Sequence, residues 1–260
     1  QWPDHWHICL DKVKGLSGLM AENIILSARM QAVADMVKIG NRVCDVGCDH
    51  GYVSIYLVQR GIAPGVLAMD INKGPLQRDK IHVAQAELSE YITLRISDGL
   101  EKYQIGEAQT LICAGMGGRL MQTILEKEPE KTKSFAQMLL QPQSELLSFR
   151  RFLRETGYSI KRENMVLEGD KFYPVIEAVP GMQGRIEKDY ELSDRFGPEL
   201  LADRNPVLVK YLQREWKNSL KLREVLKASK GSRRAEKRCM ELEKELVFLE
   251  KALRICGCDL

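Results

Sequence analysis

The chain has 260 residues, of which 44% are hydrophobic and 29% are charged. These proportions are those of an ordinary globular protein, and they exclude a disordered chain, a collagen-like fibre and a small disulfide scaffold. The 39 Lys and Arg residues nearly balance the 36 Asp and Glu residues, so the net charge of +3 says little about partners. The length predicts one or two domains of roughly 150 residues each.

The sequence indicates a cytoplasmic protein. No stretch approaches the roughly 18 apolar residues of a membrane span, and the first residues lack the apolar core of a signal peptide. The 7 cysteines are odd in number and form no paired Cys-x-x-Cys knuckles, so we expect reduced thiols and no metal. Residues 1–19 show no clear period, whereas Met20 precedes a well-patterned segment. We expect residues 1–19 to be a leader that is not native or is disordered, and we expect no metal site at His5, His7 and Cys9.

From there, strands and helices alternate along the chain. Ser27 is a predicted N-cap for a helix that carries apolar residues at helical spacing as far as Val37. The next predicted elements are a strand at 42–46, a helix at 52–59, a strand at 66–69, a helix at 75–90, strands at 92–96 and 110–114, a helix from 120, a strand at 136–141, a helix at 144–156, and two antiparallel strands at 158–167 and 172–179.

This alternation predicts an α/β, Rossmann-like fold over residues 20–183, in which helices cover both faces of a mostly parallel sheet. Such sheets bind ligands beyond the carboxyl ends of their strands. Polar or glycine residues follow five predicted strands, at 45–51, 70, 98–99, 115–118 and 141–142. Because polar or glycine residues follow all five of these strands, the sequence predicts a ligand site at the carboxyl edge of the sheet.

The turn at 45–51 allows a ligand to approach the backbone. Gly47 and Gly51 lack side chains, and the helix that starts at Tyr52 offers free N–H groups. Asp70 ends the next strand, where a carboxylate can accept hydrogen bonds from a ribose diol. Asp98 and Gly99 follow the third strand, where an adenine ring would lie. Together these residues predict a cofactor that contains a nucleoside.

Two such cofactors compete. NAD requires the pattern Gly-x-Gly-x-x-Gly, and here Asp49 and Tyr52 stand in place of the second and third glycines. Asp45 and Asp49 make the loop acidic, which suits the sulfonium and ammonium groups of S-adenosyl-L-methionine better than a pyrophosphate. We therefore favour S-adenosyl-L-methionine, with tight turns that bind nothing as the alternative.

Residues 43–52 resemble the first motif of class I S-adenosylmethionine methyltransferases. With Asp-His between the glycines, they resemble more narrowly the bacterial tRNA (adenine(22)-N1)-methyltransferase family. Further matching segments lie at 26–34, 69–76, 97–100, 114–118, 139–142 and 175–181, whereas Gln109 stands where the family leads us to expect an acid. The cofactor contacts that follow from the loop chemistry and the resemblance are Asp45, Gly47, Cys48, Asp49, His50, Gly51, Asp70, Ile71, Asp98, Gly99 and Ala114.

The C-terminal part, residues 184–260, predicts a separate antiparallel helical hairpin. Residues 206–229 and 235–256 each have the pattern of one long helix, and the segment Lys230-Gly-Ser232 supplies a turn. The apolar spacing of three and four residues is typical of a coiled-coil seam. Its predicted members are Val209, Leu212, Trp216, Ser219, Leu222 and Leu226 in the first helix and Cys239, Leu242, Leu246, Leu249 and Leu253 in the second.

The hairpin tip is strongly basic. Residues 204–240 hold 12 Lys and Arg residues against 3 Glu residues, whereas a solvated coiled-coil face mixes both signs, as residues 241–251 do. We therefore expect contact with RNA phosphates there. The predicted RNA contacts are Lys217, Lys221, Lys227, Lys230, Arg233, Arg234, Lys237 and Arg238, with Arg29 and Gln141 as secondary candidates.

A methyl-donor site beside a basic arm predicts an RNA methyltransferase. The resemblance implies that N1 of adenine 22 in a tRNA is the acceptor. N1 has a free lone pair, so positioning carries the catalysis, and the base must be unpaired or extruded. The predicted catalytic segment is Gly115, Met116, Gly117 and Gly118, where the glycines leave room for the base and Met116 packs on its face.

Three alternatives remain open at this point. The chain could methylate ribosomal RNA or a protein, or its coiled coil could bind a partner protein beside a vestigial nucleotide site. An NAD oxidoreductase is the third, against which the glycine pattern argues. The oligomeric state is open, with a monomer favoured.

Overall fold

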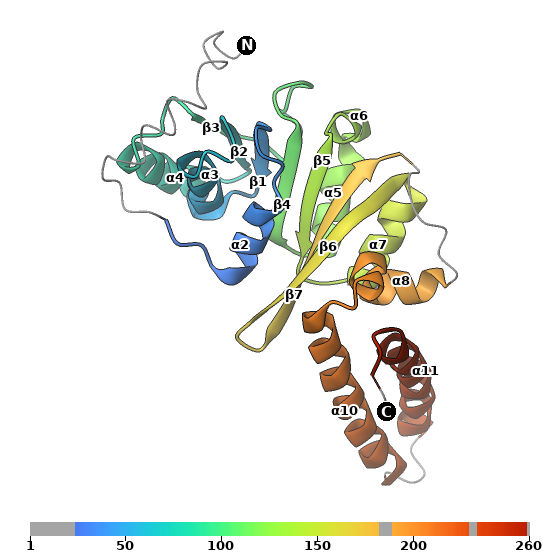
Figure 1. Ribbon diagram of the computed structural model, residues 1–260. Coiled ribbons are helices and arrows are strands. Elements are labelled where there is room, and N and C mark those ends of the chain that lie inside the picture. Colours follow the sequence, from blue (N-terminus) through green and yellow to red (C-terminus); the bar gives the residue numbers. More distant parts are fainter. Residues whose placement is uncertain (1–23, 182–188, 229–232, 259–260) are drawn as a thin grey trace.

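A computed structural model describes residues 24–181, 189–228 and 233–258. A seven-stranded sheet runs through the fold with the strand order β3-β2-β1-β4-β5-β7-β6 (Figure 1). The strands are β1 (Val43–Val46), β2 (Val66–Asp70), β3 (Ile92–Ile96), β4 (Thr110–Met116), β5 (Gln137–Pro142), β6 (Tyr158–Glu168) and β7 (Lys171–Pro180). The first five strands pair in parallel, and β7 is antiparallel to both β5 and β6. The predicted mostly parallel sheet is therefore confirmed, whereas the predicted leader, residues 1–19, and Met20 lie outside the described part.

The central strands of the sheet are buried on both sides, and they carry apolar side chains on both faces. Successive side chains point to opposite faces, so Cys44 and Leu111 join one core cluster while Val43 and Ile112 join the other. Helices α2 (Ala28–Asp35), α3 (Tyr52–Gln59) and α4 (Lys73–Gln85) cover the second of these faces. Helices α5 (Gly118–Lys127), α6 (Pro129–Lys133) and α7 (Leu146–Glu155) lie on the other side. This double covering confirms the Rossmann-like fold.

Most predicted elements are confirmed to within a few residues, and the differences have local causes. The helix predicted at 75–90 ends at Gln85, and Glu87 beyond it takes a left-handed φ of 58°. The helix predicted from 144 begins at Leu146, after Glu145 with a φ of 58°. The sequence did not indicate α6, α8 (Tyr190–Phe196) and α9 (Pro198–Ala202), since elements of 5 to 7 residues are too short for a clear apolar period.

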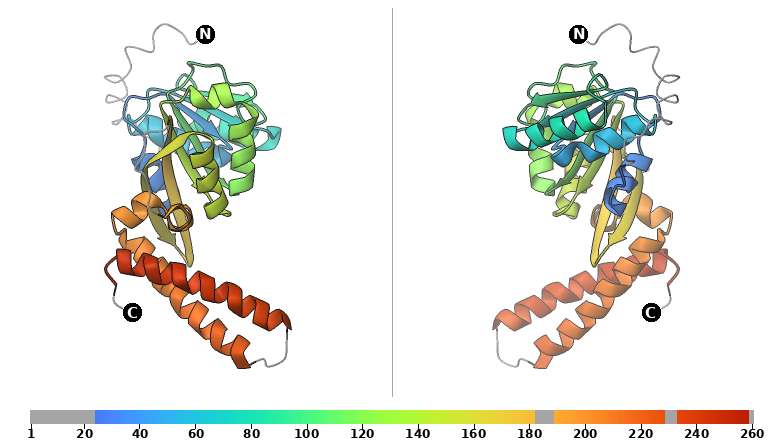
Figure 2. Two further views of the ribbon diagram at one scale, coloured as in Figure 1. Left: turned by 90° about the vertical axis from the view of Figure 1, so that its right-hand side faces the viewer. Right: turned by 90° about the vertical axis from the view of Figure 1, so that its left-hand side faces the viewer.

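Two long helices, α10 (Pro206–Ala228) and α11 (Arg233–Ile255), run side by side away from the sheet (Figure 2). The predicted hairpin is thus present, although its turn at 229–232 lies outside the described residues. The seam is confirmed on α11, where Leu242, Leu246, Leu249 and Leu253 are buried. On α10 it is partly wrong: Leu208 is buried in place of Val209, and Leu222 is 40% exposed. A straight helix turns every 3.6 residues, so a strict 3.5-residue stripe drifts away from its partner.

A buried ion pair helps to attach the arm, which is the hairpin of α10 and α11, to the sheet. Arg150 on α7 and Glu163 on β6 are 2.8 Å apart, with side chains 1% and 0% exposed. The second carboxylate oxygen of Glu163 accepts the backbone N–H of Glu199 at the start of α9. Beside them, Arg154 pairs with Asp194 of α8 at 2.9 Å. These contacts fix α8 and α9, from which α10 departs, against the α/β domain.

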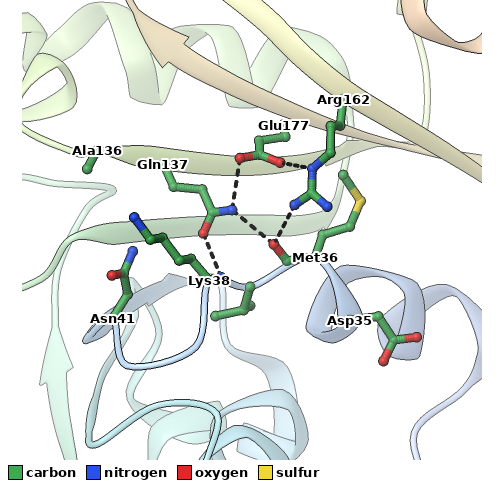
Figure 3. Close-up of a pocket in the computed structure, with 9 residues that line it drawn as sticks. Asp35, Met36, Lys38, Asn41, Ala136, Gln137, Arg162 and Glu177 are labelled. Carbon is green, nitrogen blue, oxygen red and sulfur yellow. Dashed lines mark hydrogen bonds and ion pairs between the residues drawn. The ribbon is translucent and has the colours of Figure 1, made fainter.

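A second polar network clamps the end of α2 near the amino ends of the strands (Figure 3). The side chain of Gln137 donates to the Met36 carbonyl at 2.9 Å and accepts the N–H of Lys38 at 3.1 Å. Glu177 on β7 accepts from Gln137 at 3.0 Å and pairs with Arg162 at 2.6 Å. The residues border a cavity of about 410 Å³. Because these side chains bond one another, the network holds α2 in place over the sheet.

Within the described ranges, no helix is long and apolar enough to cross a membrane. In the same part of the chain, no group of three or more His, Cys, Asp or Glu side chains is placed to hold a metal ion.

Candidate active site

The loop after β1 contains three residues with left-handed backbone within five positions. Gly47, His50 and Gly51 all have left-handed φ values, of 76°, 65° and 64°. The φ at position 47 favours glycine, and a Cβ there would lie 2.8 Å from Cε of Met116, the flexible end of that side chain. The loop therefore packs directly against the end of β4 before α3 begins.

Asp45 places a carboxylate under this loop. Its side chain is buried, and the Ser54 hydroxyl donates to it at 2.8 Å. Burial raises the pKa of the Asp45 carboxyl to about 6; the Ser54 hydrogen bond lowers this pKa and the nearby Asp79 raises it. A cation bound beside Asp45 would favour its ionised form.

Asp79 of α4 is a site residue that the sequence analysis missed. It is fully buried, accepts a hydrogen bond from the Cys48 thiol at 3.3 Å, and would lie 3.5 Å from a Cβ on Gly51. Burial and the surrounding carboxylates raise the pKa of Cys48 well above its usual value, so this thiol stays protonated and is no nucleophile. Asp79 stands between Leu76 and Val83 on the buried side of α4, and a carboxylate on an apolar stripe was the available signal.

A cleft of about 300 Å³ opens between the N-terminal half of α2, this loop and the end of β4. Met30 also belongs to it, although the sequence analysis did not single it out as a site residue. The cleft is lined by Ile25, Leu26, Ser27, Arg29, Met30, Asp45, Gly47, Cys48, His50, Tyr52, Val53, Ile112, Ala114 and Gly115. Five of the predicted cofactor residues meet here: Asp45, Gly47, Cys48, His50 and Ala114.

The other predicted cofactor residues lie along the same edge, outside this cleft. Asp70 ends β2, with its carboxylate accepting the Asn72 N–H at 2.7 Å, and Ile71 is 59% exposed. Asp98 follows β3 and pairs with Lys127 at 2.6 Å. Gly99 packs against Ile124, and the backbone of Asp49 belongs to the short turn before α3. The parallel register places the carboxyl ends of β1, β2 and β3 side by side, and this is the edge at which such sheets bind ligands.

Close packing surrounds the segment 115–118. The Cε atom of Met116 would lie 2.8 Å from a Cβ on Gly47, so this side chain lies next to the first loop, and its contact with an acceptor base stays a prediction. A Cβ on Gly118 would lie 2.5 Å from the Ser144 carbonyl oxygen, and one on Gly117 would lie 3.1 Å from the Ser144 hydroxyl. These two glycines therefore make room for the chain at Ser144. Gly115, with a φ of 80°, is the glycine that borders the cleft.

Gln141 needs reassignment, whereas the predicted RNA contact of Arg29 stays a prediction. Gln141 is fully buried and its side-chain oxygen accepts the Gly115 N–H at 3.0 Å, so it positions Gly115 and does not face RNA directly. Arg29 lies in the cleft, 3.4 Å from Glu168 at the tip of the β6–β7 hairpin and 5.3 Å from the Tyr173 ring centre. The ion pair with Glu168 holds the guanidinium of Arg29 at the wall of the cleft.

Comparison with known proteins places this geometry in a family. Residues 26–176 match the model of a methyltransferase domain. Over 230 residues the chain is 30% identical to the tRNA (adenine(22)-N(1))-methyltransferase of Bacillus subtilis, with 88% of this chain and 97% of that protein covered. The chain belongs to the tRNA (adenine(22)-N1)-methyltransferase family.

Solved structures agree with this membership. The crystal structure of the B. subtilis M1A22 tRNA methyltransferase TrmK superposes with a TM-score of 0.75 at 28% identity, over 88% of this chain and 99% of that one. A candidate tRNA (m1A22) methyltransferase of Streptococcus pneumoniae, solved in complex with S-adenosyl-L-methionine, gives a TM-score of 0.76 at 29% identity, over 88% of this chain and all of that one.

The residues of this family member fit S-adenosyl-L-methionine. The buried Asp45 carboxylate suits a cationic donor, Gly47 and Gly115 leave the backbone open to it, and the Asp70 carboxylate at the end of β2 can accept hydrogen bonds from hydroxyl groups. The cofactor, when bound, supplies an electrophilic methyl group. The match to a methyltransferase domain and the similar structure solved with S-adenosyl-L-methionine confirm the predicted cofactor class.

The raised pKa of Asp45 predicts a pH-dependent affinity. Below pH 6 the carboxyl is protonated in the ligand-free protein, so a cation that prefers the ionised form must displace a proton. We expect the dissociation constant for S-adenosyl-L-methionine to rise as the pH falls from 7 to 5, by at most about tenfold per pH unit. Titration calorimetry measures it. Asp45→Asn should bind more weakly with a flat profile, and a flat profile in the unmodified protein would contradict the prediction.

The packing of Gly118 predicts a steric effect on stability. We expect Gly118→Ala to lower the free energy of unfolding by about 1–3 kcal/mol, because its Cβ meets the Ser144 carbonyl. Gly74→Ala is the matched control, since Gly74 lies inside α4 with nothing within 4 Å of a Cβ, and we expect a gain of about 0.5–1 kcal/mol. Urea unfolding compares the two, and equal midpoints would show that α5 can shift away from Ser144.

Proposed function

We propose that this chain transfers the methyl group of S-adenosyl-L-methionine to N1 of adenine 22 in tRNA. The observation that carries the proposal is the match to a curated enzyme of this activity along nearly its whole length, including the arm. The cleft between α2, the 47–51 loop and Gly115 supports it, because it joins a donor site to open space at the end of β4. A tRNA substrate is consistent with the cytoplasmic location predicted from the sequence, which stays a prediction.

The chain's own residues contribute position and charge. Adenine N1 attacks with its free lone pair, so no general base is required, and the protonated Cys48 offers no competing nucleophile. Asp45 holds negative charge beside the donor, and Gln141 fixes the Gly115 peptide at the cleft wall. Arg29, held by Glu168, is placed to contact the RNA near the acceptor.

We propose that residues 20–183 carry the methyl transfer and that residues 184–260 carry the RNA. Six of the predicted RNA contacts on the arm have exposed side chains: Lys217, Lys221, Lys227, Arg233, Arg234 and Lys237. Arg238 differs, because it pairs with Glu241 at 3.3 Å and Glu245 at 3.1 Å on its own helix. Lys230 lies outside the described residues. The RNA surface is therefore the exposed set without Arg238.

The activity is tested with unmodified bacterial tRNA and methyl-labelled S-adenosyl-L-methionine, followed by digestion to nucleosides. We expect the label in 1-methyladenosine, and we expect it to disappear when adenine 22 is replaced by guanine. Label in another nucleoside would overturn the N1 assignment but retain the cofactor. Binding of the cofactor without transfer to any RNA would favour a protein acceptor or a partner-binding module.

The arm predicts salt-dependent tRNA binding. We expect the double variant Lys217→Gln/Lys221→Gln to weaken tRNA binding and to reduce the slope of log affinity against log salt by about 1 per lost phosphate contact. The matched control is Lys80→Gln/Lys133→Gln, which removes the same charge from exposed positions on α4 and α6. Filter binding at several salt concentrations measures both, and equal slopes for the two variants would contradict a specific role of the arm.

A further inference from the structure

Three aromatic rings gather at the mouth of the cleft. The ring centres of His50 and Tyr52 are 5.6 Å apart with planes inclined by 12°, and those of Tyr52 and His82 are 5.2 Å apart at 16°. His50 and His82 complete the group at 6.1 Å and 28°. With three stacked pairs at similar mutual distances, the rings form one compact aromatic surface and not a single column.

Local structure holds this surface in place. His50 occupies a left-handed position with a φ of 65°, which few residue types adopt, and its carbonyl lies 3.0 Å from Nδ1 of His82. Tyr52 opens α3 directly after Gly51, so its backbone direction is set by the turn. Both rings therefore sit on backbone that is fixed by α3 and α4.

The surface belongs to the cleft, and part of it is open to solvent. His50 and Tyr52 both line the cleft together with Gly115 and Met30, and Tyr52 is 43% exposed although it is a large aromatic residue. Met116, the residue predicted to pack on the base, lies with its methyl end next to Gly47. Among the residues that line the cleft, His50 and Tyr52 carry the aromatic rings on which a base can stack.

We propose that the rings of His50 and Tyr52 form the surface on which the acceptor adenine stacks. This inference rests on the proposed function. An extruded base loses the stacking of its neighbours, and aromatic side chains replace it while leaving the base edges, including N1, free to react. The proposal gives the ring of His50 a role that differs from the predicted cofactor contact. The backbone of the 47–51 loop stays part of the predicted donor site.

The charge change of the reaction adds to this argument. As the bond from N1 to the methyl carbon forms and the carbon–sulfur bond breaks, the electron pair of that bond stays on sulfur. The positive charge therefore passes from sulfur to the adenine ring system. Aromatic faces attract cations, so a Tyr face favours the methylated base over the neutral one. The surface then stabilises the transition state as well as the bound base.

The test compares Tyr52→Leu, which removes the ring, with Tyr52→Phe, which restores it. For Tyr52→Leu we expect kcat/KM for tRNA to fall about 5- to 100-fold, the range of a lost base–aromatic stack, while the dissociation constant for S-adenosyl-L-methionine changes less than twofold. Tyr52→Phe should recover most of the loss. His50→Asn is the second variant, because Asn tolerates the left-handed backbone without an aromatic ring.

Ile105 provides the control for loss of an exposed apolar side chain. It is 63% exposed and lies in the loop before β4, outside the cleft residues and outside the arm. Ile105→Ala should leave kcat/KM for tRNA unchanged. A further readout is the ratio of affinities for tRNA with and without 1-methyladenosine at position 22. We expect this ratio to fall in Tyr52→Leu and to be retained in Tyr52→Phe, which a merely structural role of the ring would not produce.

The outcomes separate the two proposals. If the unmodified protein transfers no label to tRNA, the proposed function fails and the inference fails with it. If the protein is active but Tyr52→Leu and His50→Asn keep kcat/KM within twofold, the inference alone is overturned. It is also overturned if these variants weaken cofactor binding more than tenfold without a change in the KM for tRNA, since the rings would then belong to the cofactor site.

Discussion

The close packing of the 47–51 loop is the constraint on which the site depends. Gly47 lies against Met116 from β4, and Gly51 lies against Asp79 from α4. The positive φ of 76° makes glycine necessary at position 47, so this backbone turn sets the spacing between the loop and the end of β4. That spacing brings the buried Asp45 to the donor site, opens α3 at Tyr52, and leaves Gly115 at the cleft wall.

Helix α2 closes the cleft from the other side, and it is held at both ends. At its start, the backbone N–H and the side chain of Arg29 contact Glu168 on the tip of the β6–β7 hairpin. At its end, the Met36 carbonyl is bound by Gln137 and Arg162 in the network of Figure 3. The antiparallel strands thus fix the helix that carries one wall of the cleft.

The same hairpin links the cleft to the arm. Arg214 on α10 donates to the Asp170 carbonyl at 2.7 Å and stacks on Phe172, while Phe172 meets Tyr211 edge to face. Together with the buried Arg150–Glu163 pair, these contacts attach the arm through several points and not through one flexible joint. The arm is therefore attached to the hairpin whose tip contacts Arg29 in the cleft.

Local patterns in the sequence were enough to predict the sheet, most helices, the acidic donor loop and the basic arm, because alternation, helical spacing and turn residues act over a few neighbouring positions. They did not predict that Asp79 and Met30 join the site, that Met116 turns toward Gly47, or that Gln141 is buried. They also did not predict that Leu208, and not Val209, is the buried residue of the seam on α10. Each of these depends on which atoms of distant elements compete for one space, and packing settles that competition only when the whole chain is folded.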